Sequence, residues 1–283
     1  LPGVQFTLES ADAVVVDDSF AWFKTSIVNE EMRTPSGNVW SAQKKKRKGI
    51  VSLSSVCEIE GGVTGYQAQE ILTALSDGNK KGITNAVPFI VSGNILKGRI
   101  QSGNVRYMKH DFKDPYLNIG SKVITKGKKS LFESSKVVIA GMTKEIRATY
   151  VKNPLAVGVG VFSVTRSDIP MDAVSAVLNS LAFTFLYREK FEAKHLAGGY
   201  LAINASQLKD ADFPSDLSDK EIRELSAWAK SIGTKGFSLK ERIEYERYVA
   251  SLFGVTAKEI GSLEVFDKES AEVIEALRKA KAA

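Results

Sequence analysis

Residues 136–151, KVVIAGMTKEIRATYV, contain two segments rich in apolar and β-branched residues, separated by a short polar turn. The first, Lys136–Ala140, is an apolar run of the kind found in strands buried on both faces. The second, Ile146–Val151, and a third, Val157–Val164, predict two further strands, which we expect to be antiparallel. Gly158 and Gly160 alternate with valines in the third segment, so we interpret them as strand residues and not as a cofactor-binding loop.

The periodicity changes to that of a helix after Pro170. Asp172–Tyr187 carries apolar residues at helical spacing, and proline suits the start of a helix. Further helices are predicted after Pro214, one of them with Ser218 and Glu221 at capping-box spacing. These helices cover residues 219–231, 239–253, 257–263 and 268–280. The sequence therefore predicts an α+β fold, with a mixed β-sheet domain and a helical C-terminal part.

The sequence before residue 136 predicts shorter elements. Residues 1–28 favour two or three strands with a turn at Asp17-Asp18, and residues 29–49 are polar and read as a linker. From residue 50 onward the expected elements are a strand, or a short helix and a strand, over 50–59, a flexible loop over 61–66, and strands over 87–91 and 99–100. The predicted domain limits are 1–49, 50–214 and 215–283.

Charge is distributed unevenly along the chain. The net charge is +6, yet residues 44–152 hold 20 Lys and Arg against 8 Asp and Glu, while the remainder holds 19 against 25. A basic block beside an acidic remainder indicates a polyanionic partner for the first part. The alternative is a set of solvated lysines with no partner, and charge alone does not separate the two.

Several chemistries are poorly supported by the composition. Cys57 is the one cysteine, and only two histidines are present, His110 and His195, so neither a disulfide framework nor a thiolate zinc site can be built. We predict no metal site and no catalytic residue in this chain. No apolar run is long enough for a membrane helix, and a cytoplasmic location is expected. The start at Leu1, without Met or a signal peptide, suggests an excised fragment.

Two short motifs resemble catalytic signatures. Asp114-Pro115-Tyr116 is one proline short of the loop that holds a flipped adenine in methyltransferases, and we interpret it as a turn. Asp168 or Asp172 followed by Glu192-Ala193-Lys194 matches the pattern of magnesium-dependent nucleases. Such motifs arise by chance in charged proteins, so a metal-dependent DNA nuclease is kept as an alternative function, as is a protein-interaction scaffold.

Several strings, in this order, resemble the specificity region of adenine-specific DNA methyltransferases of the Taq type and of fused restriction–modification enzymes. The first is a leucine–isoleucine–Gly–Thr–Gly element, and the last is a helix pair that has Phe253 where tyrosine is usual. The matching strings are Leu53–Gly65, Pro88–Ile95, Leu131–Ile139, Leu178–Ser180, Leu196–Leu201, Phe213-Pro214 and Tyr248–Ile260. Together they span residues 50–263, and residues 66–84 show no match.

The resemblance implies a DNA target-recognition domain that positions a catalytic domain absent from this chain. Residues 1–49 would then be a linker or the trailing edge of a methyltransferase domain. The implied partners are double-stranded DNA and a methyltransferase or nuclease domain of the same parent protein. No cofactor is expected in this chain, since S-adenosylmethionine would belong to the missing methyltransferase domain.

A recognition domain needs Lys and Arg for phosphates, and Arg, Lys, Asn and Gln for base edges. Residues 94–109 hold both kinds in a loop-like context with Gly93, Gly98 and Gly103, although an ordinary exposed hairpin would show the same residues. Gly198-Gly199 is also the usual composition of a helix C-cap. The predicted DNA-binding residues are Asn94, Lys97, Arg99, Gln101, Asn104, Arg106, Tyr107, Lys109, Lys126, Lys128, Lys144, Arg147, Lys194, Gly198, Gly199 and Tyr200.

Overall fold

The chain forms two compact units, residues 1–48 and residues 49–283. The structure, a computed structural model, describes residues 49–78, 85–191, 199–264 and 268–279, together with Arg47 and four short strands of the first unit. Those strands form two antiparallel pairs, β1 (Val4–Phe6) with β2 (Val14–Val16) and β3 (Glu31–Arg33) with β4 (Val39–Ser41). Two or three strands before residue 28 were predicted, and β1 and β2 are described there. The stretch interpreted as a linker contains the β3–β4 hairpin. The predicted turn at Asp17-Asp18 lies outside the described residues.

The central sheet of the second unit is antiparallel, with strand order β16-β14-β18-β6. Alternate side chains of β14 point to opposite faces of this sheet, so Val137 and Ile139 enter one hydrophobic core while Val138 and Ala140 enter another. This is why the whole strand is apolar in sequence and buried in the structure. Its members are β6 (Cys57–Gly61), β14 (Lys136–Ala140), β16 (Ala148–Val151) and β18 (Val161–Ser167). The three predicted strands are confirmed, except that residues 158–160 connect β17 to β18 and are not strand residues.

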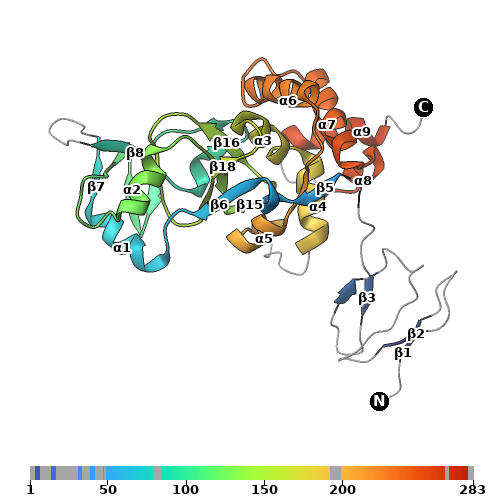
Figure 1. The fold of residues 1–283 in the computed structure, drawn as a ribbon, viewed down its shortest axis with the longest axis horizontal. Helices are drawn as coiled ribbons and strands as arrows, with labels where there is room; N and C mark the ends of the chain where they lie inside the picture. The colour runs from blue at the N-terminus through green and yellow to red at the C-terminus, as the bar shows by residue number, and fades with distance from the viewer. Residues whose placement is uncertain are drawn as a thin grey trace. The chain divides into compact units, whose positions relative to one another are not determined.

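A second, mixed sheet has the order β17-β8-β13-β7, with β17 parallel to β8. It consists of β7 (Leu75–Asp77), β8 (Ala86–Ile90), β13 (Pro115–Asn118) and β17 (Ala156–Val157), and it lies near helices α1 (Gly65–Thr73) and α2 (Lys126–Glu133) at one end of the unit (Figure 1). The flexible loop predicted for residues 61–66 is wrong at its end, because Thr64 caps α1 in a capping box with Gln67. The turn predicted at residues 114–116 is also wrong, since Pro115 opens β13.

The single helix predicted over residues 172–187 is two helices, α3 (Met171–Leu178) and α4 (Leu181–Phe191). The break occurs because polar side chains at the junction bond to the backbone. Asn179 donates to Ser175 O, and the hydroxyl of Ser180 accepts from the N–H of Phe183. Asparagine and serine compete in this way with helical hydrogen bonding, and apolar periodicity does not reveal the effect.

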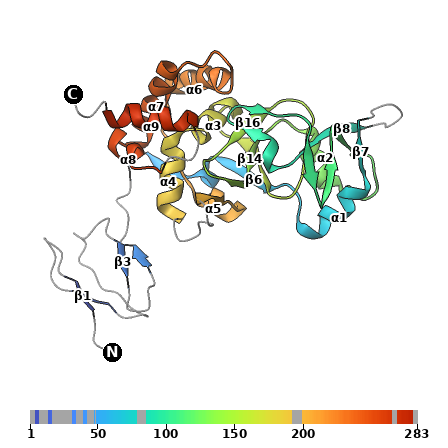
Figure 2. The ribbon, with the colours of Figure 1, turned by 180° about the vertical axis from the view of Figure 1, so that it is seen from behind.

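The C-terminal helices are α6 (Asp219–Ser231), α7 (Leu239–Phe253), α8 (Ala257–Gly261) and α9 (Lys268–Lys279). The predicted capping box of Ser218 and Glu221 is confirmed. These helices share one core with α3, α4 and a face of the central sheet, and they lie at the end of the unit away from α1 and α2 in both views (Figures 1 and 2). The α+β fold with a helical C-terminal part is confirmed. Among the described helices, none has the length and apolar character needed to cross a membrane.

The predicted limit between residues 214 and 215 stays a prediction. At this limit β20 (Asp212–Pro214) returns to pair antiparallel with β5 (Ile50–Ser52). The two ends of the predicted domain 50–214 are therefore hydrogen-bonded to each other. The short helix η1 (Leu53–Ser55) follows β5 and precedes β6, as the sequence over residues 50–59 predicts.

Candidate nucleic-acid interface

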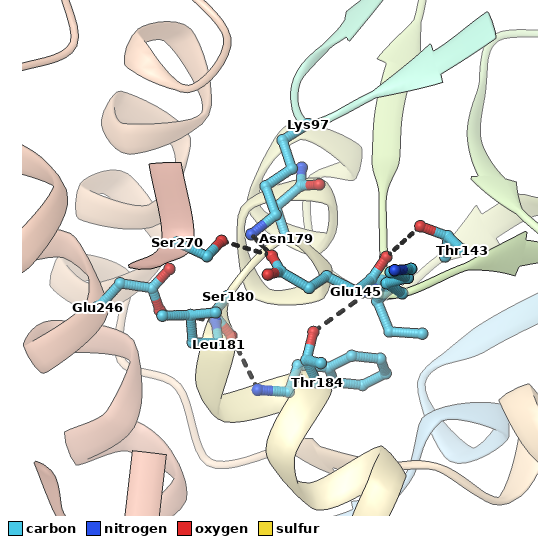
Figure 3. A network of polar contacts seen from close by, with 12 residues as sticks. Lys97, Thr143, Glu145, Asn179, Ser180, Leu181, Thr184, Glu246 and Ser270 are labelled. Atoms are coloured by element: carbon cyan, nitrogen blue, oxygen red, sulfur yellow. Dashed lines mark hydrogen bonds and ion pairs between the residues drawn. The ribbon is translucent and has the colours of Figure 1, made fainter. Parts of the chain in front are cut away.

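Residues 143–148 span the irregular connection from β15 (Met142–Thr143) to β16 and are largely buried. Buried backbone groups must find partners, and here helix side chains provide them. The hydroxyl of Thr184 accepts from the N–H of Ile146 at 3.2 Å, and the amide of Asn179 bonds both the N–H and the carbonyl of Ala148 at 2.9 and 2.8 Å. Figure 3 shows this network, which fixes the segment that carries Lys144 and Arg147.

Glu145 points inward from the same segment and is buried. Its Oε2 lies 2.7 Å from the ammonium of Lys97 and 2.7 Å from the hydroxyl of Ser270, which donates to it (Figure 3). Lys97 lies between β9 (Ile95–Leu96) and β10 (Arg99–Ile100). The ion pair therefore joins the β9–β10 hairpin, the 143–148 segment and helix α9. A buried carboxylate requires such a charged partner, so Lys97 has a structural role that the sequence did not indicate.

Three predicted residues, Lys97, Arg99 and Arg147, line one cavity of about 600 Å³. The loop between α6 and α7 and helix α7 add two cations to it, Lys235 and Arg242. These two residues lie more than 85 positions from the other three in the chain, so sequence reasoning missed them. The structure thus gathers basic residues that the sequence places in two distant regions.

Glu246, on α7, is a buried acidic residue in the wall of this cavity. Its Oε2 accepts a hydrogen bond of 2.7 Å from the N–H of Leu181 at the start of α4. Burial away from water raises the pKa of this carboxyl to about 7, although the ammonium of Lys97 and the Leu181 N–H oppose the shift. The carboxyl therefore exchanges its proton near neutral pH.

Lys144 and Tyr200, two of the predicted DNA-binding residues, lie together. The Lys144 ammonium is 5.2 Å from the centre of the Tyr200 ring, in cation–π geometry. Arg188 holds both segments, because one guanidinium nitrogen donates to Lys144 O and to Gly199 O, each at 2.6 Å. Strands β15 and β19 (Leu201–Ala202) pair beside them, with Met142 opposite Ala202. Met142 is 60% exposed and Tyr200 is 42% exposed. We call Met142, Lys144, Gly199 and Tyr200 the aromatic patch.

The predicted residues between 94 and 109 separate into scaffold and surface. Asn94 is buried, donates to Gln101 O and Gly103 O at 2.9 Å each, and accepts from the Val91 N–H. Tyr107 is buried too, in contact with the ring of another buried aromatic residue, Phe89. The prediction that Asn94 and Tyr107 contact DNA therefore needs correction, since both side chains are buried inside the domain.

The exposed members of this region lie around the hairpin of β11 (Val105–Tyr107) and β12 (His110–Phe112). Its tight turn has positive φ at Met108 and Lys109, a conformation that matches the twist of two-residue hairpins. Arg106 lies on β11 with its side chain 75% exposed. The exposed predicted residues are Arg99, Gln101, Asn104, Arg106 and Lys109. We call these five residues the hairpin face.

Lys126 and Lys128 lie in the first turn of α2, after its N-cap Thr125. Lys126 is exposed, whereas the ammonium of Lys128 donates to Gly61 O at 2.8 Å, and burial lowers its pKa. The contact brings the Gly61–Gly65 connection beside α2. Tyr66, 84% exposed in α1, follows that connection and was not predicted as a contact.

Lys194 and Gly198 lie outside the described residues, as does the Glu192-Ala193-Lys194 motif of the nuclease alternative. Asp172, one of the two acids proposed to act with that motif, accepts hydrogen bonds from the Ser226 hydroxyl and the Ala173 N–H. Within the described parts of the chain, no group of three His, Cys, Asp or Glu side chains could hold a metal ion. Cys57 is buried, and its burial raises the pKa of the thiol to about 11.

No protein-family model matches the chain, and no curated protein does. Among solved structures, the chain is similar to a component of a type I restriction–modification system (15% identity, TM-score 0.38, 82% of this chain and 47% of that one). It is also similar to the type IIL restriction–modification enzyme MmeI in complex with DNA (7% identity, TM-score 0.39, 93% and 40%). A third is the HsdS subunit from Thermoanaerobacter tengcongensis (13% identity, TM-score 0.35, 83% and 44%). The chain spans less than half the length of each of these structures.

Proposed function

We propose that this chain is a sequence-specific DNA-recognition domain of a restriction–modification methyltransferase or restriction enzyme. The observation that carries the proposal is the aromatic patch, in which residues from two distant parts of the chain meet on the surface. Arg188 fixes both backbones that carry the patch. Rigid positioning of a partly exposed lysine and an exposed aromatic ring suits the contact of phosphates and bases.

The hairpin face supplies the second kind of contact. Gln101 and Asn104 carry both donors and acceptors, and Arg106 carries a planar fork of donors, which are the groups that distinguish base edges in the major groove. Asn94 ties the 101–103 loop to the sheet from inside. Reading a base requires that the loop keep a fixed position relative to the duplex. The bonds from the buried Asn94 amide hold the 101–103 loop in place.

Other cationic side chains are proposed to contact DNA phosphates and to take no part in reading the base sequence. Lys126 and Lys109 are exposed, and flexible ammonium groups bind phosphates as point charges. They belong to the basic block of residues 44–152. Such contacts raise affinity for any duplex and make it depend on salt.

The finer assignment rests on the resemblance to adenine-specific methyltransferases of the Taq type. Under this proposal a methyltransferase or nuclease domain of the same parent protein performs the chemistry, and S-adenosylmethionine binds in that methyltransferase domain. The described part of this chain positions the partner domain on its target and contributes no catalytic group.

Selection from a pool of random-sequence duplexes tests the proposal. We expect repeated rounds of binding to enrich one short sequence. Arg106→Ala is expected to relax the preference at one base pair, because a bidentate arginine contributes about 1–3 kcal/mol of discrimination. Arg166→Ala is the matched control, since both arginines are 75% exposed and ion-paired to a surface acid.

The control variant should enrich the same sequence as the unaltered chain. If the unaltered chain binds duplexes but enriches none of them, the recognition role is refuted and a nonspecific basic face remains. If Arg106→Ala and Arg166→Ala enrich identical sequences, the assignment of the hairpin face is refuted.

A further inference from the structure

The cavity between the β9–β10 hairpin and the helical part is walled by five cationic side chains, Lys97, Arg99, Arg147, Lys235 and Arg242. Three acids of the described residues lie among them: Glu246 is in the wall itself, Glu145 is paired with Lys97, and Glu272 is 3.7 Å from Arg242. The cationic side chains are thus gathered in a concave site, where the field on an anion is strongest.

Close backbone packing fixes one wall of the cavity. Gly98, with a φ of +69°, lies against Ile232, and a Cβ at Gly98 would be 2.3 Å from Ile232 O. Gly233, with a φ of +81°, lies against the carbonyl of Lys97. A Cβ at Gly233 would be 2.5 Å from Lys97 O. Two glycines are therefore required where the α6–α7 loop contacts the β9–β10 hairpin. This contact sets the separation between Arg99 and the loop residue Lys235.

The remaining wall is apolar and has room for more than a simple ion. Leu96, Ile232 and Phe237 contribute to it, and a volume of about 600 Å³ is in the range of small-molecule sites. Arginine forks match the geometry of phosphate oxygens. A ligand with a phosphate group and an apolar or aromatic body fits this combination of charge and surface.

We propose that this cavity binds the phosphate groups of a nucleotide, with Arg99, Arg147, Lys235 and Arg242 on the phosphates and Phe237 beside the base. The inference goes beyond DNA recognition, because the site is concave, shares Arg99 alone with the hairpin face and shares no residue with the aromatic patch. The same chemistry has two sources, a free nucleoside phosphate or a nucleotide of a bound strand. The experiment has one arm for each source.

The first arm measures ATP binding to the full chain by calorimetry, at low salt. The test variant is Lys235→Glu, on an exposed loop, and the matched control is Lys240→Glu, whose lysine is also exposed but lies on α7 outside the cavity. We expect ATP affinity to fall at least tenfold in Lys235→Glu and to change less than twofold in Lys240→Glu. Arg99→Glu, a second exposed position in the wall, should repeat the loss.

The second arm measures duplex affinity of the same variants. If ATP does not bind, but duplex affinity falls in Lys235→Glu well beyond the change in Lys240→Glu, the nucleotide belongs to DNA and the proposal stands. If neither ligand distinguishes the cavity variants from Lys240→Glu, the proposal is overturned. A chain that binds ATP through the cavity but binds no duplex would refute the DNA-recognition function and leave this inference intact.

Discussion

Replacing Glu246 by glutamine should remove a large part of the pH dependence of folding. Glu246 is buried between α7 and the start of α4, where burial raises the pKa of its carboxyl from 4.5 to about 7. A pKa raised in the folded state means that the folded protein binds the proton more tightly than the unfolded chain does. The stabilisation is therefore complete below pH 4.5 and is lost as pH rises through 7. Between pH 5 and pH 8 the two pKa values correspond to a loss of about 2.5 kcal/mol.

Glutamine keeps an oxygen that can accept from the Leu181 N–H, and it has no proton to lose. The free energy of unfolding, measured with denaturant, should fall between pH 5 and pH 8 in the unaltered chain. In Glu246→Gln this fall should be smaller by about 2.5 kcal/mol. Glu244→Gln is the matched control, because Glu244 lies on the same helix with its side chain 53% exposed. The control should follow the unaltered chain at both pH values. Equal losses in Glu246→Gln and the unaltered chain would refute the assignment of a buried titrating carboxyl.

Three further predictions test other parts of the structure. Burial lowers the pKa of Lys136 from 10.5 to about 8, so the unaltered chain should gain about 2.5 kcal/mol of stability relative to Lys136→Met between pH 7 and pH 10. Denaturant unfolding at both pH values measures this gain. An equal change of stability in the two proteins would contradict it. Gly98→Ala should cost about 3 kcal/mol, because its Cβ meets the Ile232 carbonyl, whereas Gly78→Ala, at the same φ but in open space, should cost about 1 kcal/mol. Equal costs in thermal unfolding would disprove the close contact. Arg188→Met should lower stability by about 2 kcal/mol and duplex affinity about tenfold, since it holds the aromatic patch, and unchanged duplex affinity in an anisotropy titration would remove the patch from the interface.

The elements that could be predicted from sequence are those in which the residues of the element itself produce the pattern. The apolar run of β14 reflects burial on both faces, and α6 and α7 carry amphipathic spacing with serine caps, so their positions are confirmed. The break between α3 and α4 was missed because it arises from Asn179 and Ser180 bonding to the nearby backbone, which competes with helical hydrogen bonding. Asn179 also bonds Ala148, 31 residues away, a contact that the sequence does not reveal.

The site was less predictable than the fold for a related reason. Residue type alone does not distinguish a polar side chain on the surface from one that is buried and holds a loop in place. Asn94 is the clearest case, since its side chain bonds to backbone groups of Val91, Gln101 and Gly103. Lys235 and Arg242 were missed because they lie in the acidic remainder of the chain, outside the basic block. The sequence shows a glycine at position 98, but the reason for it, the close approach of the α6–α7 loop, requires the structure.

Equilibrium binding of the full chain to random-sequence duplex DNA across a salt series tests the central claim most directly. Arg99, Lys109, Lys126 and Lys144 are the cations that the account places against phosphates. About four such contacts predict that log affinity falls with log salt with a slope of roughly −3 to −4. Absence of binding at about 50 mM salt, where electrostatic contacts are strong, or a slope near zero, would contradict the account.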